Sequence, residues 1–482
     1  MEIRKIFELV NQVEKEQGLP VFVVGGFVRD FLIGREQKKD IDFVVAGSGI
    51  EFAKKFDEAF KQEGDLIEFP DFDTARYILG EEKIVIEFAG ARSEEYKIDS
   101  RKPKVETATL EEDLSRRDFT VNAMAVPVAV FCGLRAASLV KVKKNLFDPF
   151  NGQKDLKAKI LRTPLDPDQT FRDDPLRLMR AIRFATQLGF SIEAKTLESI
   201  YHHRERIKII SSERVQEELL KLLSCSRPYV GLVIMFQTHL LDLILPEVAK
   251  LDGVEEVFGH QHKNNLVHTF KVVDNIAERS DKAMLRLAGL LHDVGKYGTK
   301  EFVAGTGWTF YQHEHLGRKL AVNICRRLRL SKEQTNYVSK LVRWHQQPIS
   351  LMDEGITDSA VRRLIVNLGE DLEDLLILGV SDITTGNPYK LKKRQENYIR
   401  LRQRVEEVME KDKMRAFQSP LRGDEVMQLA NLKAGPTVGK IKKAIEEAIL
   451  EGHIPNEYEP AKEYFQKIKD DFIQTAEDWE RA

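Results

Sequence analysis

The amino-acid sequence predicts an α+β protein, in which a small head of mixed sheet and helices precedes domains built from helices. Three observations support this class. Short apolar runs bounded by turn residues occur within the first 150 residues or so, as in buried strands. From residue 152 onward, apolar residues recur at helical spacing. The chain has 482 residues, which is more than one core normally serves, so several domains are expected.

The head begins with a helix. Residues 1–18 carry apolar side chains along one side at helical spacing. The apolar run 21–24 then ends at Gly25-Gly26, which indicates a buried strand followed by a turn. Two further strands are expected at 40–45 and 83–88, with helical stretches between them.

Beyond the head the pattern is helical in two blocks, 152–250 and 260–390, and the second holds most of the histidines. The polar and basic stretch 388–393 suggests a boundary, and a final helical piece is expected over 423–452. The expected domains are 1–150, 151–255, 256–390 and 391–482.

Composition limits the classes of protein. The 75 Lys and Arg residues are balanced by 77 Asp and Glu, so the total charge gives no support to RNA binding, although a local positive stripe would suffice for it. Three dispersed cysteines without a CxxC pair argue against a disulfide framework and fit a reducing compartment. Acidic residues interrupt the N-terminal apolar pattern, and no stretch is long and uncharged enough to span a bilayer. We expect a cytoplasmic protein with no membrane partner.

Asp40 and Asp42 lie on one predicted strand, separated by one residue. Side chains on a strand alternate faces, so both carboxylates share a face while Ile41 and Phe43 point to the core. Paired carboxylates suit Mg²⁺, and such a site has room for two ions. Taken alone, an acidic pair at a strand end is more often simply solvated.

The turn at Gly25-Gly26 lies just upstream of this pair and precedes a helical stretch. Paired glycines let the backbone approach phosphate oxygens, and a helix N-terminus offers free N–H groups there. Arg29 adds a cation for a charge-assisted contact. A phosphate-binding turn close before an aspartate pair is far rarer than either feature alone.

These motifs carry a family resemblance. GGFVRD followed by DID resembles the signature of the DNA polymerase beta superfamily, in its class II CCA-adding and poly(A) polymerase branch, and residues 116–125 are similar to that branch's RRDFTxNA. The resemblance implies a polymerase-beta-like head that uses Mg²⁺, with Arg117, Asp118 and Asn122 contacting ribose and triphosphate. It also implies a third catalytic carboxylate, for which Glu87 is the candidate; a solvated position on the strand is the alternative.

Asp173-Asp174-Pro175 is a helix-start signal, and Asp174 and Arg177 share a helical face. Cytosine and adenine both present an amine donor beside a ring-nitrogen acceptor, which a carboxylate and a guanidinium match. Uracil and guanine present the opposite pattern, so this pair would select CTP and ATP without a template. A capping Asp and an ion-paired Arg remain the alternative.

This stretch is similar to the family's base-reading EDxxR motif and the RAxRF sequence after it, which implies nucleotide contacts by Arg180 and Arg183. Asp173 departs from the family, which often has Glu there. Residues 214–219 resemble the family's helix-stabilising motif, and the tail from Leu421 resembles that of bacterial CCA-adding enzymes carrying an HD domain. Candidate phosphate contacts lie in four basic clusters: 101–104, 141–144, 390–394 and 440–443.

In the second helical block, residues 290–296 read LLHDVGK, and this adjacent His-Asp pair resembles an HD-type phosphohydrolase. Neutral imidazoles and carboxylates bind divalent metals, and Mn²⁺, Ni²⁺, Co²⁺, Fe²⁺ and Mg²⁺ are all chemically suited. An HD domain that has lost turnover would have nearly the same sequence. His260, His262 and His315 are nearby alternatives as ligands. The expected metal ligands are His268, His292, Asp293, His313, His345 and Asp382.

We therefore expect ordered addition of C, C and A to the 3′ end of tRNA from CTP and ATP, by attack of the 3′ hydroxyl on the α-phosphate. A poly(A) polymerase, a CC-adding enzyme and an A-adding enzyme are the alternatives within the family. The stretch 92–113 is long enough for the flexible loop that CC addition requires, which disfavours an A-adder. From other classes, an HD phosphohydrolase with an RNA-binding front half and a non-catalytic RNA-binding protein remain.

Overall fold

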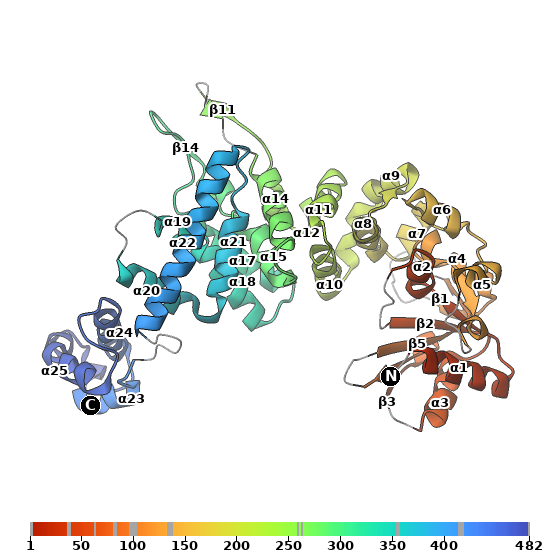
Figure 1. The fold of residues 1–482 in the computed structure, drawn as a ribbon, viewed down its shortest axis with the longest axis horizontal. Coiled ribbons are helices and arrows are strands. Elements are labelled where there is room, and N and C mark those ends of the chain that lie inside the picture. Colours follow the sequence, from red (N-terminus) through yellow and green to blue (C-terminus); the bar gives the residue numbers. More distant parts are fainter. Residues whose placement is uncertain are drawn as a thin grey trace. The chain divides into compact units, whose positions relative to one another are not determined.

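The computed structural model divides into two compact units, Met1–Ala249 and Lys250–Ala482, and each is described by itself (Figure 1). Across the part of the chain that is described, no helix has the length and apolarity to cross a bilayer. The structure describes residues 3–35, 40–61, 64–80, 84–95, 104–132, 138–257, 260–261, 264–352, 357–412 and 419–480.

A six-stranded mixed sheet organises the first unit, in the order β3-β4-β5-β2-β1-β8. The central strands β1 (Val21–Val24), β2 (Asp40–Val45) and β5 (Ile84–Gly90) agree with the three expected ones. β2 pairs with β1 antiparallel and with β5 parallel. The flanking strands were not expected from the sequence: β3 (Gly64–Phe69), β4 (Thr74–Leu79) and β8 (Ala125–Pro127).

Helices α1 (Ile3–Gln17) and α3 (Gly49–Ala59) pack through aromatic side chains that converge on the sheet. Phe7 of α1 contacts Phe43 of β2, and Phe56 of α3 contacts Phe88 of β5. Ile41 and Phe43 are buried, as strand alternation requires, so Asp40 and Asp42 point away from this core. The helix expected over residues 1–18 is confirmed. The first unit also contains α2 (Gly26–Leu32), the paired strands β6 (Arg92–Glu95) and β7 (Lys104–Thr107), α4 (Leu110–Ser115) and α5 (Leu139–Lys144).

The rest of the first unit is helical, apart from one parallel pair of two-residue strands, Ile160–Leu161 and Ser191–Ile192. α8 (Leu176–Leu188) lies at its centre and is buried on nearly all sides. The helix start predicted at Asp173-Asp174-Pro175 is confirmed, since α7 ends at Asp173, α8 begins at Leu176 and the Asp174 side chain accepts from the Leu176 N–H. Asp174 is extended because the residue before a proline avoids the helical region. The other helices are α6 (Gly152–Ala158), α7 (Pro167–Asp173), α9 (Ala194–His203), α10 (Ser212–Leu223), α11 (Pro228–Gln237), α12 (Leu240–Ile244) and α13 (Pro246–Ala249).

The second unit contains a helical bundle in which α17 (His313–Arg327) packs along α18 (Lys332–Trp344), and α14 (Asn265–Ala277) packs on α15 (Ala283–Leu291). The stretch 388–393, where a boundary was predicted, forms the first turns of α22 (Pro388–Asp412). The side chain of Asn387 caps this helix. The bundle also contains α16 (Lys296–Thr299), α19 (Gln347–Ser350), α20 (Asp358–Leu368), α21 (Leu372–Ser381), and the short strands β11 (Glu256–Val257), β12 (His260–Gln261), β13 (Glu301–Val303) and β14 (Gly307–Thr309).

The tail forms its own small core around Phe465 and Ile441. The single helical piece expected over 423–452 is two helices, α23 (Gly423–Ala430) and α24 (Pro436–Leu450), followed by α25 (Tyr458–Gln474). The break falls where Asn431 adopts a left-handed conformation, with φ of 51°, ahead of Gly435-Pro436.

Candidate functional site

A cavity of about 820 Å³ in the first unit brings together every residue that the sequence analysis assigned to catalysis or nucleotide binding there. These residues come from the sheet, from the turn after β1, from the segment around α4 and from α8. Side chains from more than 130 positions apart in the sequence thus share one site. They are Gly25, Gly26, Arg29, Asp40, Asp42, Glu87, Arg117, Asp118, Asn122, Asp174, Arg177, Arg180 and Arg183.

Three carboxylates meet at the sheet side of this cavity. Asp42 of β2 stands directly beside Glu87 of β5 in the parallel register, and Asp40 lies two residues earlier on the same face. Burial, Glu87 and Asp40 together raise the pKa of Asp42 to about 6, an increase that Arg117 and Arg180 only partly offset. A divalent cation would relieve this mutual repulsion, so the three oxygen donors suit a hard ion such as Mg²⁺. Glu87 also pairs with Arg76 of the adjacent strand, at 3.1 Å.

The Gly25 turn fits closely against these carboxylates. Gly25 has φ of 72°, and a Cβ there would lie 3.0 Å from Asp42 Oδ2 and 3.2 Å from Arg117 Nη1. Any side chain would therefore be strained and would press on both groups. Position 25 therefore requires glycine, because its backbone lies so close to Asp42 and Arg117.

The next residues form a buried chain of polar contacts. Arg29, at 2% exposure, donates through Nε to Asp30 Oδ1 (2.8 Å) and through Nη1 to Asn122 Oδ1 (2.7 Å). Asn122 Nδ2 donates to Asp118 Oδ1 at 2.9 Å. Asp118 Oδ2 in turn accepts from Arg180 Nε at 2.9 Å. The turn after β1 is thus connected to helix α8 by charged side chains.

Asp118 remains ionised within this chain. Burial raises the pKa of Asp118, but the Arg180 guanidinium and the Asn122 amide more than offset it and lower the pKa to about 2. On α8, Arg183 donates to Glu218 Oε2 at 2.5 Å, and its guanidinium lies over the Phe184 ring at 3.9 Å from the centroid. Asp118 and Glu218 therefore orient Arg180 and Arg183, which line the cavity.

A buried carboxylate likewise positions Arg117. Asp113 is fully buried at the end of α4, and its two oxygens accept from Arg116 and Arg117. Burial raises the pKa of Asp113, and the two guanidiniums overcome this and lower it. The sequence analysis did not single out Asp113, Asp30 or Glu218, because their partners are known only once the chain is folded.

Asp174 and Arg177 both line the cavity and are anchored separately. Asp174 Oδ1 accepts from the backbone N–H of Leu176 at 3.1 Å. Arg177 Nη2 donates to the backbone oxygen of Arg116 at 2.5 Å. This holds the guanidinium at the junction between the RRDF segment and α8.

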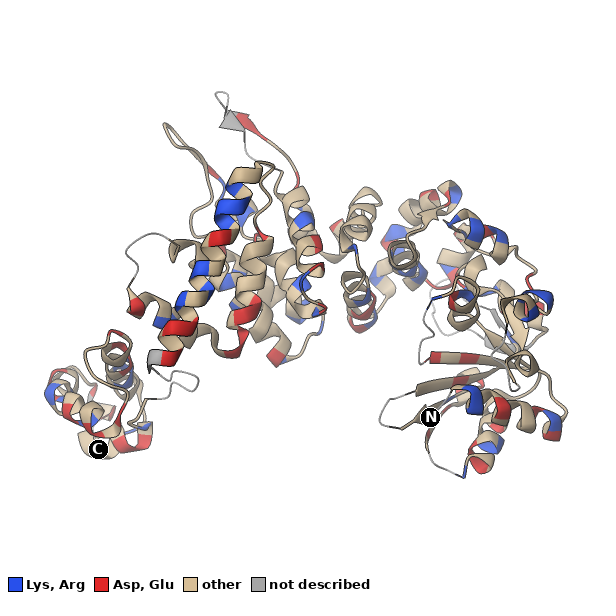
Figure 2. Ribbon diagram, in the orientation of Figure 1, with Lys and Arg blue, Asp and Glu red and all other residues tan. Residues whose placement is uncertain are grey.

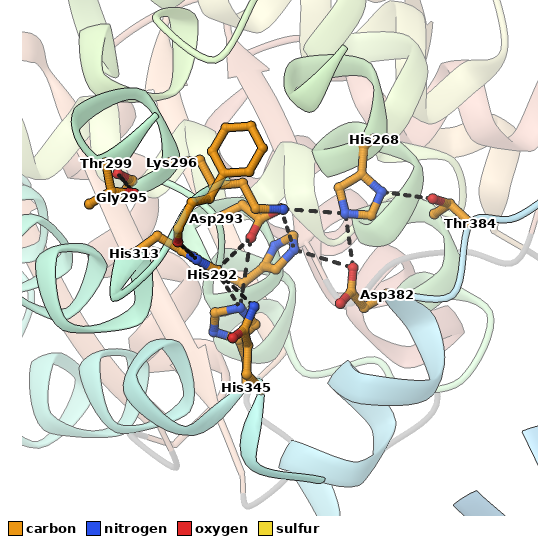
Figure 3. Close-up of polar contacts among 12 residues, drawn as sticks. His268, His292, Asp293, Gly295, Lys296, Thr299, His313, His345, Asp382 and Thr384 are labelled. Carbon is orange, nitrogen blue, oxygen red and sulfur yellow. Dashed lines mark hydrogen bonds and ion pairs between the residues drawn. The ribbon is translucent and has the colours of Figure 1, made fainter. Parts of the chain in front are cut away.

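A second cluster, in the helical bundle of the second unit, gathers all six expected metal ligands (Figure 3). They form two triads: His268, His292 and Asp382 in one, and Asp293, His313 and His345 in the other. Asp293 joins the triads. Its Oδ2 lies 3.2 Å from His292 Nε2 and 3.5 Å from His268 Nε2, while its Oδ1 lies 3.3 Å from His313 Nε2.

The ring orientations fit a metal. The Nδ1 atoms of His292, His313 and His345 bond to backbone oxygens of Gly289, Phe310 and Val342 at 2.7, 2.8 and 2.8 Å, which turns each Nε2 inward. His268 Nδ1 bonds to Thr384 at 2.7 Å. These backbone contacts aim the ring nitrogens at a common centre.

The electrostatics point the same way. His292 Nε2 is buried and makes no hydrogen bond among the described residues. Burial lowers the pKa of His292, yet Asp293 and Asp382 raise it to about 10, so the pocket favours positive charge. Burial lowers the pKa of His345 to about 3, which leaves a neutral imidazole able to coordinate a metal. The group as a whole therefore suits a divalent cation.

The alternative ligands fare differently. His315 Nε2 bonds to Arg343, and the ring is exposed at the surface of the bundle. The backbone of His260 lies in β12, and His262 is outside the described residues. Lys296, the last residue of the LLHDVGK motif, donates a hydrogen bond to Asp293 Oδ2 at 2.5 Å.

Three family models match the chain. Residues 21–162 match the poly A polymerase head domain, residues 189–251 match the probable RNA and SrmB-binding site of polymerase A, and residues 265–381 match the HD domain. The first covers the sheet and the cavity residues up to Asn122, and the third covers five of the six expected ligands and ends one residue before Asp382.

Three relatives span most of the sequence. The CC-adding tRNA nucleotidyltransferase of Thermus thermophilus is 32% identical over 443 residues, 90% of each chain. The A-adding tRNA nucleotidyltransferase of Deinococcus radiodurans is 32% identical over 72% of this chain and 76% of its own. The multifunctional CCA protein of Vibrio campbellii is 34% identical over 65% of this chain and 72% of its own.

The fold matches a solved structure over its full length. The Bacillus stearothermophilus CCA-adding enzyme in complex with CTP superposes with a TM-score of 0.68, covering 99% of this chain and 100% of that one. Identity over this alignment is 21%, so the likeness is one of fold.

Proposed function

The chain belongs to the tRNA nucleotidyltransferases that carry a poly A polymerase head, and we propose that it completes tRNA 3′ ends by adding C, C and A from CTP and ATP. One observation carries this proposal: a single cavity collects the three carboxylates, the glycine turn and the arginines of the family's motifs. A relic that only bound RNA would have no need for a crowded acidic cluster at such an electrostatic cost.

Asp40, Asp42 and Glu87 are the residues that would hold divalent ions, and Mg²⁺ is the ion that fits three hard oxygen donors. When bound, such ions neutralise triphosphate charge and lower the pKa of an attacking hydroxyl. The tRNA 3′ hydroxyl attacks the α-phosphate in line, a new P–O bond forms, and pyrophosphate leaves.

The arginines and the turn hold the nucleotide. The Gly25 turn brings backbone N–H groups to the triphosphate, and Arg117, held by Asp113, supplies a guanidinium beside it. Arg29 and Asp118 lie within the buried chain of contacts, so their part is to keep Asn122 and Arg180 in place. Positioning of this kind lowers the barrier by fixing the reacting groups before attack.

Base selection falls to Asp174 and Arg177, at the start of α8. The Asp174 carboxylate accepts from the exocyclic amine of C or A, and the Arg177 guanidinium donates to the ring nitrogen. The anchoring of Arg177 to the backbone of Arg116 supports a fixed template. Uracil and guanine would leave both groups opposite mismatched partners.

Full CCA addition competes with CC addition, A addition and poly(A) synthesis, since relatives of the first three kinds resemble this chain. The 92–113 stretch contains the paired strands β6 and β7 and the first residues of α4, and its length favours CC addition. The residues between the two strands lie outside the described ones.

For the second unit we propose a metal-dependent phosphohydrolase acting on phosphate esters at RNA ends. The observation that favours it is the pair of triads joined by Asp293, with ring nitrogens aimed inward. The HD model implies a divalent metal, and Mn²⁺, Ni²⁺, Co²⁺, Fe²⁺ and Mg²⁺ all suit mixed nitrogen and oxygen donors. Water supplies the oxygen that replaces the ester oxygen on phosphorus.

Two variants of the full-length chain test both activities. Asp42→Asn should reduce incorporation of labelled CTP and ATP into tRNA at least about 1,000-fold while phosphate release from a 3′-phosphorylated RNA is kept. Asp293→Asn should do the reverse. Equal loss of both activities in either variant would contradict the assignment of separate centres.

A further inference from the structure

Two exposed tyrosines of the second unit lie near ligands of the metal cluster in the sequence. Tyr311 and Tyr389 are 72% and 76% exposed, and among the large hydrophobic side chains of the described residues only Val140 exceeds them. Tyr311 lies two residues before the ligand His313, and Tyr389 lies seven residues after the ligand Asp382. Neither ring contributes to the bundle's core, so packing does not account for them.

A run of cations follows Tyr389 on the first turns of α22. Lys390, Lys392, Lys393 and Arg394 are all exposed, and the first acidic residue of the helix is Glu396. Figure 2 shows this start of α22 in blue. We call these four residues the basic ridge. In a chain of net charge −2, such a cluster is a strong local contrast.

The basic ridge follows the ligand Asp382 closely in the sequence. Asp382 and Pro388 are six residues apart, which limits their separation to roughly 20 Å. α22 packs tightly on α21, since a Cβ on Gly379 would lie 2.3 Å from the Tyr398 hydroxyl.

We propose that Tyr311, Tyr389 and the basic ridge form a docking surface for single-stranded RNA, which leads an RNA 3′ end to the HD metal cluster. This inference rests on the hydrolase proposed for that cluster and names its substrate class. Exposed aromatic rings stack on unpaired bases, and adjacent cations contact the phosphates between them. A duplex offers no free base face, so the surface favours single strands.

The test uses the full-length protein and an eight-nucleotide RNA that carries a 3′ phosphate and 4-thiouridine at its last two bases. After irradiation, cross-linked peptides should contain Tyr311 or Tyr389, and excess single-stranded RNA should compete better than duplex. The double variant Tyr311→Ala/Tyr389→Ala should lower the cross-link yield about tenfold or more. Tyr458→Ala, on α25 of the same unit, is the matched control and should not.

A charge variant gives an independent check. Lys390→Glu/Lys393→Glu should raise the KM for phosphate release from this RNA about tenfold or more, and should change hydrolysis of glycerol 2-phosphate less than about twofold. Lys467→Glu/Lys469→Glu, on α25, is the matched control and should leave this KM unchanged. Cross-links that map only elsewhere, or that survive in the tyrosine variant, overturn the docking surface. Cross-links at the tyrosines without any phosphate release support the surface and contradict the hydrolase.

Discussion

The Asp42 carboxylate lies at the centre of the acidic cluster in the first unit. It lies beside Glu87, two residues from Asp40, and within van der Waals reach of a Cβ at Gly25. Burial and the two neighbouring carboxylates hold its pKa at about 6, well above the usual 3.8. The folded protein therefore carries an electrostatic strain that a cation relieves.

Removing this charge should stabilise the metal-free protein at high pH. The raised pKa means that the folded state holds its proton up to about pH 6, whereas the unfolded chain loses it near 3.8, so stability falls as pH rises through that window. We expect Asp42→Asn in EDTA to raise the free energy of unfolding of the first unit by about 2 kcal/mol at pH 8. The gain should shrink toward zero near pH 4.

Chemical unfolding at several pH values measures this effect, and Asp65→Asn, at an exposed position on β3, is the control. If the gain in the free energy of unfolding does not depend on pH, then side-chain packing at position 42, rather than the charge of Asp42, causes it. Mg²⁺ should stabilise the wild-type protein more than Asp42→Asn, because the variant lacks one of the three oxygen donors.

Asp174 should control which base is accepted. With Asp174→Ala, the amine of C or A loses its acceptor, and Arg177 keeps its anchor on Arg116. We expect kcat/KM for CTP and ATP to fall about 100-fold, with much less discrimination against UTP. Steady-state incorporation into tRNA measures this, and Asp166→Ala, at an exposed helix cap, should leave it unchanged. Retained discrimination would place base selection elsewhere.

The residues proposed to contact substrate were predictable because each belongs to a local pattern. Strand alternation places Asp40 and Asp42 on one face, and the helix-start signal places Asp174 just before α8, which carries Arg177. The residues that orient them were not predictable. Asp113, at the end of α4, and Glu218, on α10, orient arginines that come close to them only in the folded chain. Sequence spacing therefore does not identify these ion-pair partners.

At the scale of elements, α8 joins the proposed base-reading residues to the buried chain of contacts. Its Arg180 meets Asp118, its Arg183 meets Glu218 of α10, and both guanidiniums lie over the Phe184 ring. Glu218 is 3% exposed, so these arginines take the place of water around its carboxylate. α8 and α10 are therefore held together by a buried ion pair.

Breaking that pair should be costly. Glu218→Ala leaves Arg183 buried without its carboxylate, and we expect a loss of about 3 kcal/mol in the free energy of unfolding of the first unit. Hydrogen exchange resolved by peptide should show the loss on α8 and α10, with the second unit unchanged. The neighbouring Glu217→Ala is the control, because its exposed pair with Lys221 should contribute less than about 1 kcal/mol. Similar losses in both variants would contradict the role of the buried pair.

Elements with clear periodicity were predictable, and those made by context were not. α1 and the strands of the 21–45 region carry their own apolar pattern. β3 does not, because as an edge strand it is exposed over most of its length. The start of α22 looks like a linker, since its first turns are polar and basic; the helix is stabilised by the Asn387 cap and by packing further along.

At the scale of the molecule, two units each carry a cluster of ionisable residues suited to metal. The first gathers oxygen donors around a cavity large enough for a nucleotide, and the second gathers histidines and aspartates in a helical bundle. The donor sets differ in kind, with carboxylates alone in one and mixed nitrogen and oxygen in the other. The combination supports addition at a 3′ end in one unit and hydrolysis of phosphate esters in the other.

The most direct test of the central claim is to size the products made from tRNAs that end before, within and one nucleotide short of CCA, with Mg²⁺, CTP and ATP. Products are resolved at single-nucleotide resolution. We predict that all three substrates are extended to the same CCA end and that synthesis then stops. Long A tails, addition of C alone or of A alone, or no incorporation would each contradict the proposal that this chain completes the CCA end.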